Sequence, residues 1–365
     1  MEVDGVIATA ASLLAETVTL AAPGHIQLQS GQDTTHTVIS QTALSAFVGA
    51  TASLNANLQW GVSVTGQLSA SHSHTDSQSV TQVDTTVSGA KNVTIDNGAG
   101  STTLDGAKIS GGSVDVTAGN LDITSAQNTA SYLSTNESGG VSFAIPVYGT
   151  GGEMGFSVNA SAGVLYDTYT STEASGLSGL YAGQGGLDVK VANNTTLNAG
   201  IMESTAASGN MVTTGSLTVH DEQNKSEYAG ASASISYGNL GGGGNAGPID
   251  PQNGTSQKKF GAGGNVNGTG ALILDVDTST SHSAIGQNIT VDAGSVSGNL
   301  SRDPSTASHA LSNGFDAGTA GEILSLTESA VTSAQAAYKE SIAVPKLITN
   351  KTMPMSEKIK NATKQ

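Results

Sequence analysis

Short apolar triplets separated by Gly, Asn and Asp residues recur along most of the chain. Val93-Thr-Ile95 and Val114-Asp-Val116 are two examples, and the step from Val93 to Val114 is 21 residues. A strand of three residues points two side chains to one side and one to the other, and Gly, Asn and Asp favour the turns between such strands. The pattern predicts a parallel β-solenoid in which each coil covers the apolar face of its neighbour.

A second pattern is a long alternation of apolar and polar residues, which indicates a strand with one buried face. The apolar positions are Leu54, Ala56, Leu58, Trp60, Val62 and Val64 in the first run, and Val141, Phe143, Ile145, Val147, Phe156, Val158 and Ala160 in the second. At about 3.3 Å per residue the first run would be one strand of roughly 35 Å. A Gly/Pro-rich loop at 240–255 interrupts the third run. We expect these runs to form β-hairpin arms that leave the coil stack once per repeat.

The triplets and the alternating runs belong to an internal repeat. IQLQSGQDTTHT from Ile26, LDITSAQNTASY from Leu121 and LTVHDEQNKSEY from Leu217 align at spacings of 95 and 96 residues. Two further pairs of markers, 93 and 94 residues apart, are TLDGAKIS from Thr103 with TLNAGIME from Thr196, and GVSVTG from Gly61 with GFSVNA from Gly155. Independent markers at nearly one period predict an array of stacked repeats.

Beyond residue 300 the pattern changes from strand to helix. Asp303 followed by Pro304 predicts a short helix that Gly314 ends. Thr319 and Glu322 form a T-x-x-E capping box for a second helix. Its apolar positions recur at helical spacing up to Pro345, at Ile323, Leu326, Ala330, Ala334 and Ala337. The basic, apolar-poor segment 346–365 is expected to be loose.

The predicted fold is therefore all-β, a parallel β-helix with β-hairpin arms and a short α-helical C-terminal tail. We expect three parts: the N-terminal edge of a truncated solenoid at 1–25, three repeats of about 95 residues at 26–300, and a helical and partly loose tail at 301–365.

Composition excludes several classes of protein. The 365 residues include 47 Gly, 37% are hydrophobic and only 12% are charged, which differs from a disordered chain. The net charge is −16 and Arg302 is the only arginine, so nucleic-acid binding is disfavoured. The absence of Cys fits an oxidising exterior. No apolar stretch is long enough for a membrane helix, and the acidic N-terminus is unlike a secretion signal. We interpret the chain as a fragment of a longer protein.

The markers carry a family likeness. TLDGAKISGG with VDVTAGNLDITSAQNT, GLYAGQGGLDVKV and LSRDPSTASHALSNGFD resemble the hemagglutinin-repeat region of filamentous-hemagglutinin-like exoproteins, which include the effectors of contact-dependent growth inhibition. The likeness covers about residues 26–316. It implies a right-handed β-helix and two-partner secretion through an outer-membrane transporter. The secretion domain with its Asn-Pro-Asn-Gly type motif, the VENN-type boundary and a toxin domain are not in this sequence.

The resemblance implies a secreted or cell-surface protein of a Gram-negative bacterium, acting in adhesion to a neighbouring or host cell or as the shaft that presents a C-terminal toxin. The two roles predict different arms. A passive adhesive shaft would pack the apolar faces of its arms on the solenoid. A delivery conduit would bring those faces into contact with the outer membrane, because strands with one apolar face can meet lipid.

The best candidate for a metal site is the cluster His72-Ser-His74-Thr-Asp76, whose three ligand types share one face of a strand. Two imidazoles and a carboxylate suit zinc or Fe(II), but a solvated hairpin base explains the same residues. His25, His36, His220, His282 and His309 are scattered along the chain. We therefore assign no metal, cofactor or catalytic residues.

A polysaccharide-binding or polysaccharide-cleaving β-helix protein is the alternative function. Such enzymes need clustered acids for acid–base catalysis, commonly beside Lys or Arg. Here the Asp residues occur singly inside triplets such as Leu121-Asp-Ile123, where they point outward. We therefore predict that the chain is not an enzyme.

Overall fold

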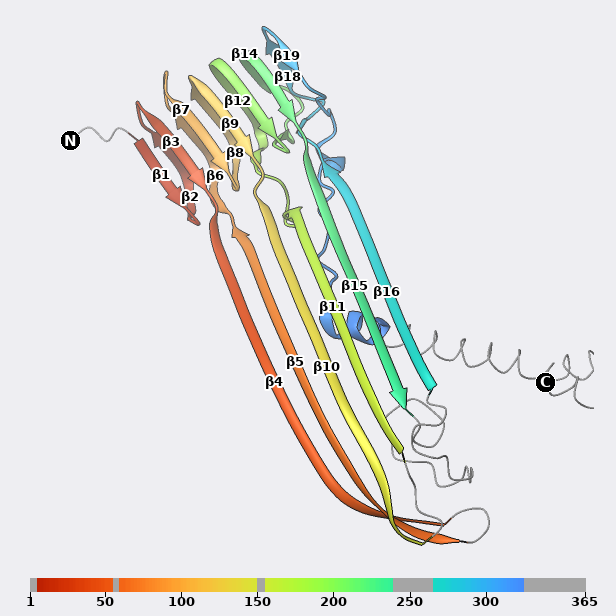
Figure 1. Ribbon diagram of the computed structural model, residues 1–365. Coiled ribbons are helices and arrows are strands. Elements are labelled where there is room, and N and C mark those ends of the chain that lie inside the picture. Colours follow the sequence, from red (N-terminus) through yellow and green to blue (C-terminus); the bar gives the residue numbers. More distant parts are fainter. Residues whose placement is uncertain (1–4, 55–58, 150–154, 239–264, 325–365) are drawn as a thin grey trace, which may run out of the picture.

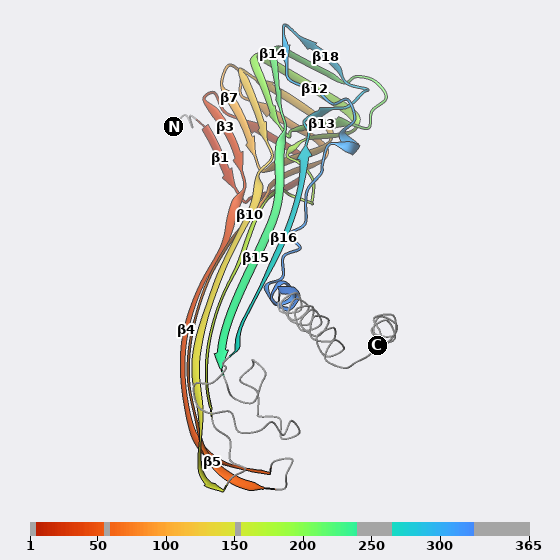
Figure 2. The ribbon, with the colours of Figure 1, turned by 45° about the vertical axis from the view of Figure 1, so that its right-hand side comes forward.

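The protein is built from two β-sheets in the computed structural model, which describes residues 5–54, 59–149, 155–238 and 265–324 (Figure 1). One sheet has 13 strands and the other has six. The 13-stranded sheet, here called the coil sheet, winds into a nearly closed stack. The six-stranded sheet, here called the arm sheet, extends from one side of that stack (Figures 1 and 2).

The coil sheet contains the short strands that the triplets predict. Its strands are β1 (Gly5–Thr9), β2 (Ser12–Ala21), β3 (His25–Gln29), β6 (Thr85–Asp96), β7 (Ser101–Asp105), β8 (Ala107–Ala118), β9 (Asn120–Thr124), β12 (Gly179–Asn198), β13 (Ile201–Ser204), β14 (Met211–His220), β17 (Ala284–Ile285), β18 (Thr290–Ala293) and β19 (Val296–Ser297). Within the described residues, all of their pairings are parallel.

The register of the coil sheet shows how one repeat is folded. Val93 of β6 pairs with Val114 of β8, so the 21-residue step is confirmed as one coil. Val114 in turn pairs with Leu187 of β12, and the chain between them makes an arm before it returns. Along the chain, a short connection between paired coil strands alternates with a long connection that contains an arm. One arm therefore leaves the stack in each repeat, as predicted.

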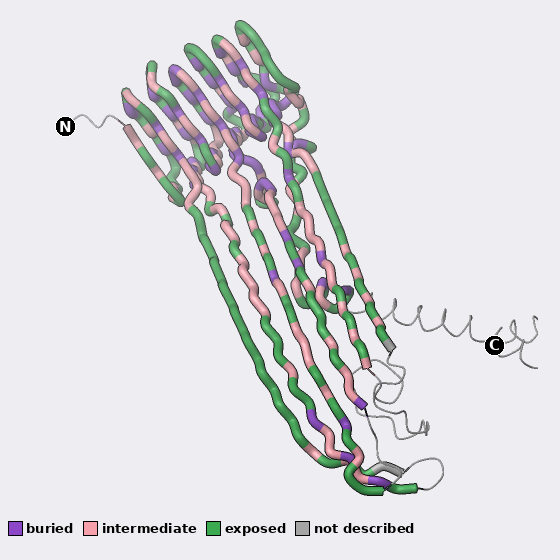
Figure 3. Tube along the Cα trace, viewed as in Figure 1, coloured by how far each residue is buried: buried purple, intermediate pink, exposed green. Residues whose placement is uncertain are grey.

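Buried residues concentrate in the coils (Figure 3), where apolar side chains of successive coils lie in register and form rows. One row is formed by in-register partners that are all at most 4% exposed: Leu28, Leu104, Ile123, Leu197 and Val219. In the neighbouring row Thr102 interrupts the apolar residues between Ile26 and Leu121, and its buried hydroxyl has no hydrogen-bond partner. Each coil therefore depends on the coils on either side of it for its core.

The arm sheet is antiparallel and consists of three hairpins. Its strands are β4 (Gly31–Leu54), β5 (Trp60–Val83), β10 (Gln127–Gly149), β11 (Gly155–Thr172), β15 (Glu222–Gly238) and β16 (Asn265–Ser281). Their order across the sheet is β16-β15-β11-β10-β5-β4, so each hairpin pairs with the hairpin of the next repeat.

The prediction of one continuous strand through the run from Leu54 to Val64 is wrong. Leu54 ends β4 and pairs with Trp60 at the start of β5, so the chain reverses within the run. Because positions 54 and 60 are paired across the hairpin, the alternation keeps its parity across the reversal. Asn is a residue type that favours turns, and the sequence has Asn at positions 55 and 57. Ala56, Leu58 and the loop at 240–255 lie outside the described residues.

The C-terminal segment follows the prediction only in part. The first predicted helix is a single 3-10 turn, Pro304–Thr306, with Asp303 as its N-cap, and it does not extend to Gly314. The chain leaves this turn because its backbone hydrogen-bonds to the arm sheet instead: the His309 amide donates to Ser281 Oγ at 3.3 Å.

The second helix begins earlier than predicted, at residue 317, and is described up to 324. Asp316 Oδ1 accepts a hydrogen bond from the Thr319 amide at 2.7 Å, so Asp316 is the N-cap and the capping box that starts at Thr319 is wrong. The rest of this predicted helix, from Leu326 onward, and the basic segment 346–365 lie outside the described residues.

A largely buried ionic cluster joins the arms to the coils. Asp84 follows β5 and Glu173 follows β11, at the points where two arms return to the stack. Lys108 Nζ lies 2.6 Å from Asp84 Oδ2 and 3.8 Å from Glu173 Oε2, and all three side chains are at most 20% exposed. Burial is the main cause of the raised pKa of Glu173. One lysine thus compensates two carboxylates at successive junctions.

Truncating a buried side chain should lower the free energy of unfolding most inside the coils. Leu104→Ala leaves a cavity between fully buried neighbours, so we expect the free energy of unfolding to fall by about 2–5 kcal/mol. Thr102→Val, at the adjacent row, removes an unsatisfied hydroxyl and should be neutral or stabilising by about 1 kcal/mol. Urea denaturation followed by circular dichroism measures both, and an unchanged Leu104→Ala protein would contradict the stacked core.

The junction cluster gives a second test. Lys108→Met leaves Asp84 and Glu173 without their cation and should lower the free energy of unfolding by about 2 kcal/mol. Lys190→Met is the matched control, because Lys190 and its partner Asp188 are 63% and 39% exposed and such pairs contribute less than about 1 kcal/mol. Equal losses in the two variants, measured by the same urea denaturation, would argue against a structural role for Lys108.

Candidate functional site

The two faces of the arm sheet differ in chemistry. Because side chains alternate along a strand and the strands are in register, residues of one parity gather on one face. The face that carries Trp60, called here the apolar face, has these exposed large side chains: Val38, Leu44, Val48, Trp60, Leu68, Leu133, Val141, Phe143, Ile145, Tyr148, Val158, Val164, Tyr166, Ile235, Tyr237, Val266, Leu272, Leu274 and Val276.

The opposite face, called here the hydroxyl face, is dominated by Ser, Thr and Asn. Neighbouring hydroxyls bond across the strands, as at Ser45 and Ser69, 2.6 Å apart, and at Ser142 and Ser157, 2.6 Å apart. Ile39 and Phe47 on the edge strand β4 are exposed apolar exceptions. Sequence reasoning missed this face, although Ser and Thr occupy almost every odd position from 63 to 81.

The apolar face is exposed, which contradicts the expectation of one buried face. Leu44 is 73% exposed, Leu272 is 73% exposed and Trp60 is 57% exposed. The arms project away from the coil stack, so the coils do not cover them, and the described part of the C-terminal segment lies on the hydroxyl face (Figures 2 and 3). Alternation predicted the apolar parity correctly, but burial requires a second layer that the described residues do not provide.

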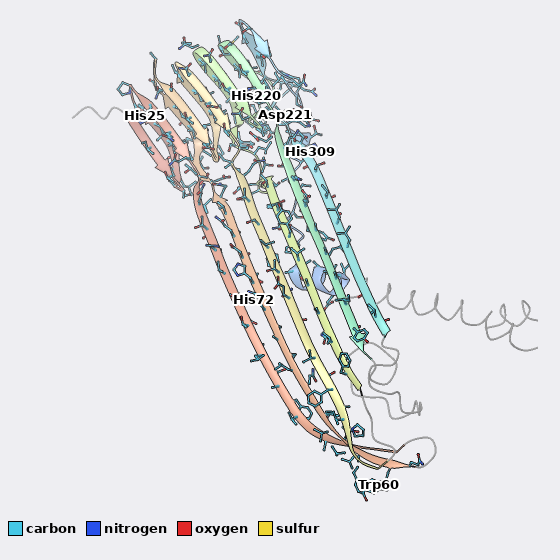
Figure 4. The ribbon with its side chains drawn as sticks, viewed as in Figure 1. His25, Trp60, His72, His220, Asp221 and His309 are labelled. Carbon is cyan, nitrogen blue, oxygen red and sulfur yellow. The ribbon has the colours of Figure 1, made fainter. Side chains whose placement is uncertain are left out.

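Aromatic residues close the far end of the apolar face. Trp60 lies at the end of the arm that is most distant from the coils (Figure 4). Its ring centroid is 5.2 Å from that of Tyr148 on β10. Six residues further along β5 from Trp60, Phe143 lies over Gly66, where a Cβ would come within 2.3 Å of the ring. Gly66 thus makes room for the Phe143 ring against the sheet.

On β5, polar residues occupy the part of the same face nearer the coils, whereas β10 and β16 carry Leu133 and Leu274 in the row of Asp76. His72, His74 and Asp76 lie at alternate positions of β5 and share the face, as predicted. They do not converge on one point: Asp76 Oδ1 is 2.9 Å from His36 Nε2 on β4, and His72 Nδ1 is 3.0 Å from the Thr42 hydroxyl. Across the described ranges, no group of three or more His, Asp or Glu could hold a metal ion.

Two groups of residues on the coils are relevant to the alternative function, a polysaccharide-binding or polysaccharide-cleaving protein. The outward Asp residues are not isolated in space, because Asp115 of β8 pairs in register with Asp188 of β12. The pKa of Asp115 is raised, first by burial and then by the charge of Asp188. A shallow groove crosses the coil flank and is lined by Ser88, Ser110, Tyr181, Glu203 and Thr205 among others. Glu203 is the only carboxylate that lines it, whereas glycosidases place two at the cleaved bond.

Within the described ranges, no helix has the length and hydropathy needed to span a bilayer.

Residues 4–139 match the family of the hemagglutinin repeat. The chain is 29% identical over 306 residues to the toxin CdiA of Escherichia coli, an alignment that covers 81% of this chain and 9% of that protein. It is 31% identical over 239 residues to the tRNA nuclease CdiA of Escherichia coli strain NC101, covering 64% of this chain and 7% of that protein. It is 31% identical over 221 residues to the deoxyribonuclease CdiA of Yersinia pseudotuberculosis, covering 59% of this chain and 19% of that protein.

The chain thus spans less than a fifth of the length of each of these relatives. The matched part is a non-catalytic repeat region, and the nuclease domains of the relatives lie outside it. No solved structure gives a significant match to the chain. The resemblance seen in the sequence is confirmed: residues 4–139 belong to the hemagglutinin-repeat family, and the chain is homologous to the CdiA toxins of contact-dependent inhibition.

Proposed function

We propose that this chain is a structural repeat segment of a secreted Gram-negative exoprotein, a shaft that acts in adhesion or in the presentation of a C-terminal toxin. We further propose that its arm sheet contacts the outer membrane of the neighbouring cell through the apolar face. In this proposal the parent protein reaches the surface through a two-partner secretion transporter, and the coils wind as a right-handed β-helix of three repeats between residues 26 and 300. Homology to CdiA supports the proposal that the chain belongs to a secreted exoprotein.

The exposed apolar face is the observation that carries the membrane contact. Soluble monomers rarely expose apolar patches larger than a few hundred Å², and larger ones mark interaction sites. Transfer of each exposed Leu, Ile, Val or Phe from water contributes on the order of 1 kcal/mol. In a passive adhesive shaft, the apolar faces of the arms would pack on the solenoid. The exposure of Leu44 and Leu272 supports a contact with lipid instead.

The length and charge of the apolar face also fit lipid. On β5 the positions from Trp60 to Ala70 on this face are apolar or Gly, whereas His72, His74 and Asp76 follow. Eleven extended residues reach roughly 35 Å, close to the ~30 Å hydrocarbon core of a bilayer. The polar end of β5 beside the coils would then lie at the level of the headgroups. The net charge of −16 argues that attraction to anionic lipid makes no contribution.

Trp60 reports the contact directly, because it is the only tryptophan and lies on the apolar face. With phosphatidylcholine vesicles, which exclude electrostatic attraction, we expect a blue shift of Trp60 emission and sedimentation of the chain with the vesicles. Leu44→Asp places a charge on the apolar face and should weaken partitioning by about tenfold or more. Its neighbour Ala43 points to the hydroxyl face, so Ala43→Asp is a matched control that should bind as the wild type does.

Unchanged emission at saturating lipid, with no sedimentation, would refute the membrane contact and leave adhesion as the better proposal. Equal weakening by Leu44→Asp and Ala43→Asp would show that binding does not use the apolar face.

A further inference from the structure

The C-terminal segment follows a track of alternate residues along β11. The Leu311 amide donates to Ser171 Oγ at 2.9 Å, and the hydroxyl of Tyr169 donates to the Leu311 carbonyl at 2.7 Å. Further along the strand, Leu165 packs against Ala320 of the helix at 317–324. Ser171, Tyr169 and Leu165 all lie on the hydroxyl face, so the segment is docked on this face over the coil-proximal part of β11.

Asp167 is the remaining residue of this track, between Leu165 and Tyr169. It pairs in register with Tyr132 on β10 and Tyr228 on β15, so tyrosines flank it on both sides. Phe315 of the docked segment contacts both rings, with centroid distances of 5.1 Å to Tyr132 and 5.9 Å to Tyr228. Beneath these rings Asp167 is 1% exposed, and its Oδ1 has no hydrogen-bond partner.

The ionisable groups of the surrounding elements leave this carboxylate uncompensated. On the hydroxyl face of β10, β11, β15 and β16 and in the docked segment they are Tyr132, Tyr169, Tyr228, Glu222, Asp275, Asp277, His309, Asp316 and Glu322. His309 is the one group among them that can become a cation, and its ring packs against His282, with a centroid distance of 5.8 Å, and not against Asp167. The Asp316 carboxylate is occupied as the helix N-cap, where the Thr319 amide holds its pKa below the usual range. A buried charge without a partner is strongly unfavourable, so the neutral form of Asp167 is favoured.

We infer that Asp167 is a proton-binding site through which pH controls the docking of residues 309–324 on the hydroxyl face. Protonation of the carboxyl removes the buried charge and strengthens docking. Ionisation favours departure of Phe315, which lets water reach the carboxylate. The C-terminal segment is therefore held more tightly in acid than at neutral pH.

The direction of the pKa shift agrees with this geometry. Burial raises the pKa of Asp167 from 3.8 to about 6 in the docked state. The docked state therefore binds more protons than the released state between these two values, and docking must strengthen as pH falls through this window. If release returns the carboxyl to its ordinary pKa, docking is roughly twentyfold stronger at pH 4.5 than at pH 7.5.

Hydrogen exchange of the full chain, corrected for the pH dependence of intrinsic exchange, tests the inference without lipid. We expect amide protection of 309–324 to be roughly twentyfold greater at pH 4.5 than at pH 7.5. Amides of β8 serve as the reference for global stability. In Asp167→Asn, which is isosteric and uncharged, the difference should disappear. Equal protection at the two pH values in the wild type, or an undiminished difference in Asp167→Asn, would overturn the inference.

Two further variants separate Asp167 from other acids. Asp275→Asn removes an exposed acid in the same row and should keep the wild-type pH dependence. Phe315→Ala opens the cover over Asp167, so protection of 309–324 should fall at both pH values and lose its pH dependence. A Phe315→Ala protein that kept the full difference would assign the effect to another group.

Discussion

The in-register stacking of parallel coils is the interaction on which the rest of the structure depends. Residues such as Leu104 lie directly between Leu28 and Ile123, so each coil completes its core only with its neighbours. That spacing also sets the distance between successive arms, because each arm begins and ends at a coil. Strands of neighbouring repeats therefore arrive at hydrogen-bonding distance, and three hairpins become one sheet. The Lys108 cluster, which joins two junctions, shows that the coil and the arm are stabilised together.

A sheet formed in this way inherits its two faces from the alternation within each repeat. Apolar positions of one hairpin lie opposite apolar positions of the next, as with Val141 and Leu68, so a weak pattern in each strand becomes a continuous surface. On the other face, Ser–Ser hydrogen bonds link the strands, and the C-terminal segment is docked. The apolar face is thus available for an external contact while the hydroxyl face makes an internal one.

Local sequence patterns predicted the strands and helices themselves better than they predicted what surrounds each strand or helix in the fold. The 21-residue coil was predictable because Val93 and Val114 carry the same triplet. The reversal between Leu54 and Trp60 was missed because alternation has the same parity on both sides of it. Asp316 caps its helix in place of Thr319 because Phe315, just before it, is anchored on the arm sheet. The environment of Asp167 depends on Phe315, 148 residues away, and no local pattern reports such a contact.

We propose that one face of the arm sheet, and not the other, meets lipid. The chain has no cysteine, so single cysteines can be introduced at adjacent positions of β5 and labelled with a polarity-sensitive fluorophore. Val64→Cys places the label on the apolar face and Thr65→Cys places it on the hydroxyl face. With phosphatidylcholine vesicles, we expect a blue shift for the label at 64 and none for the label at 65. Equal shifts at both positions, or none at either, would contradict it.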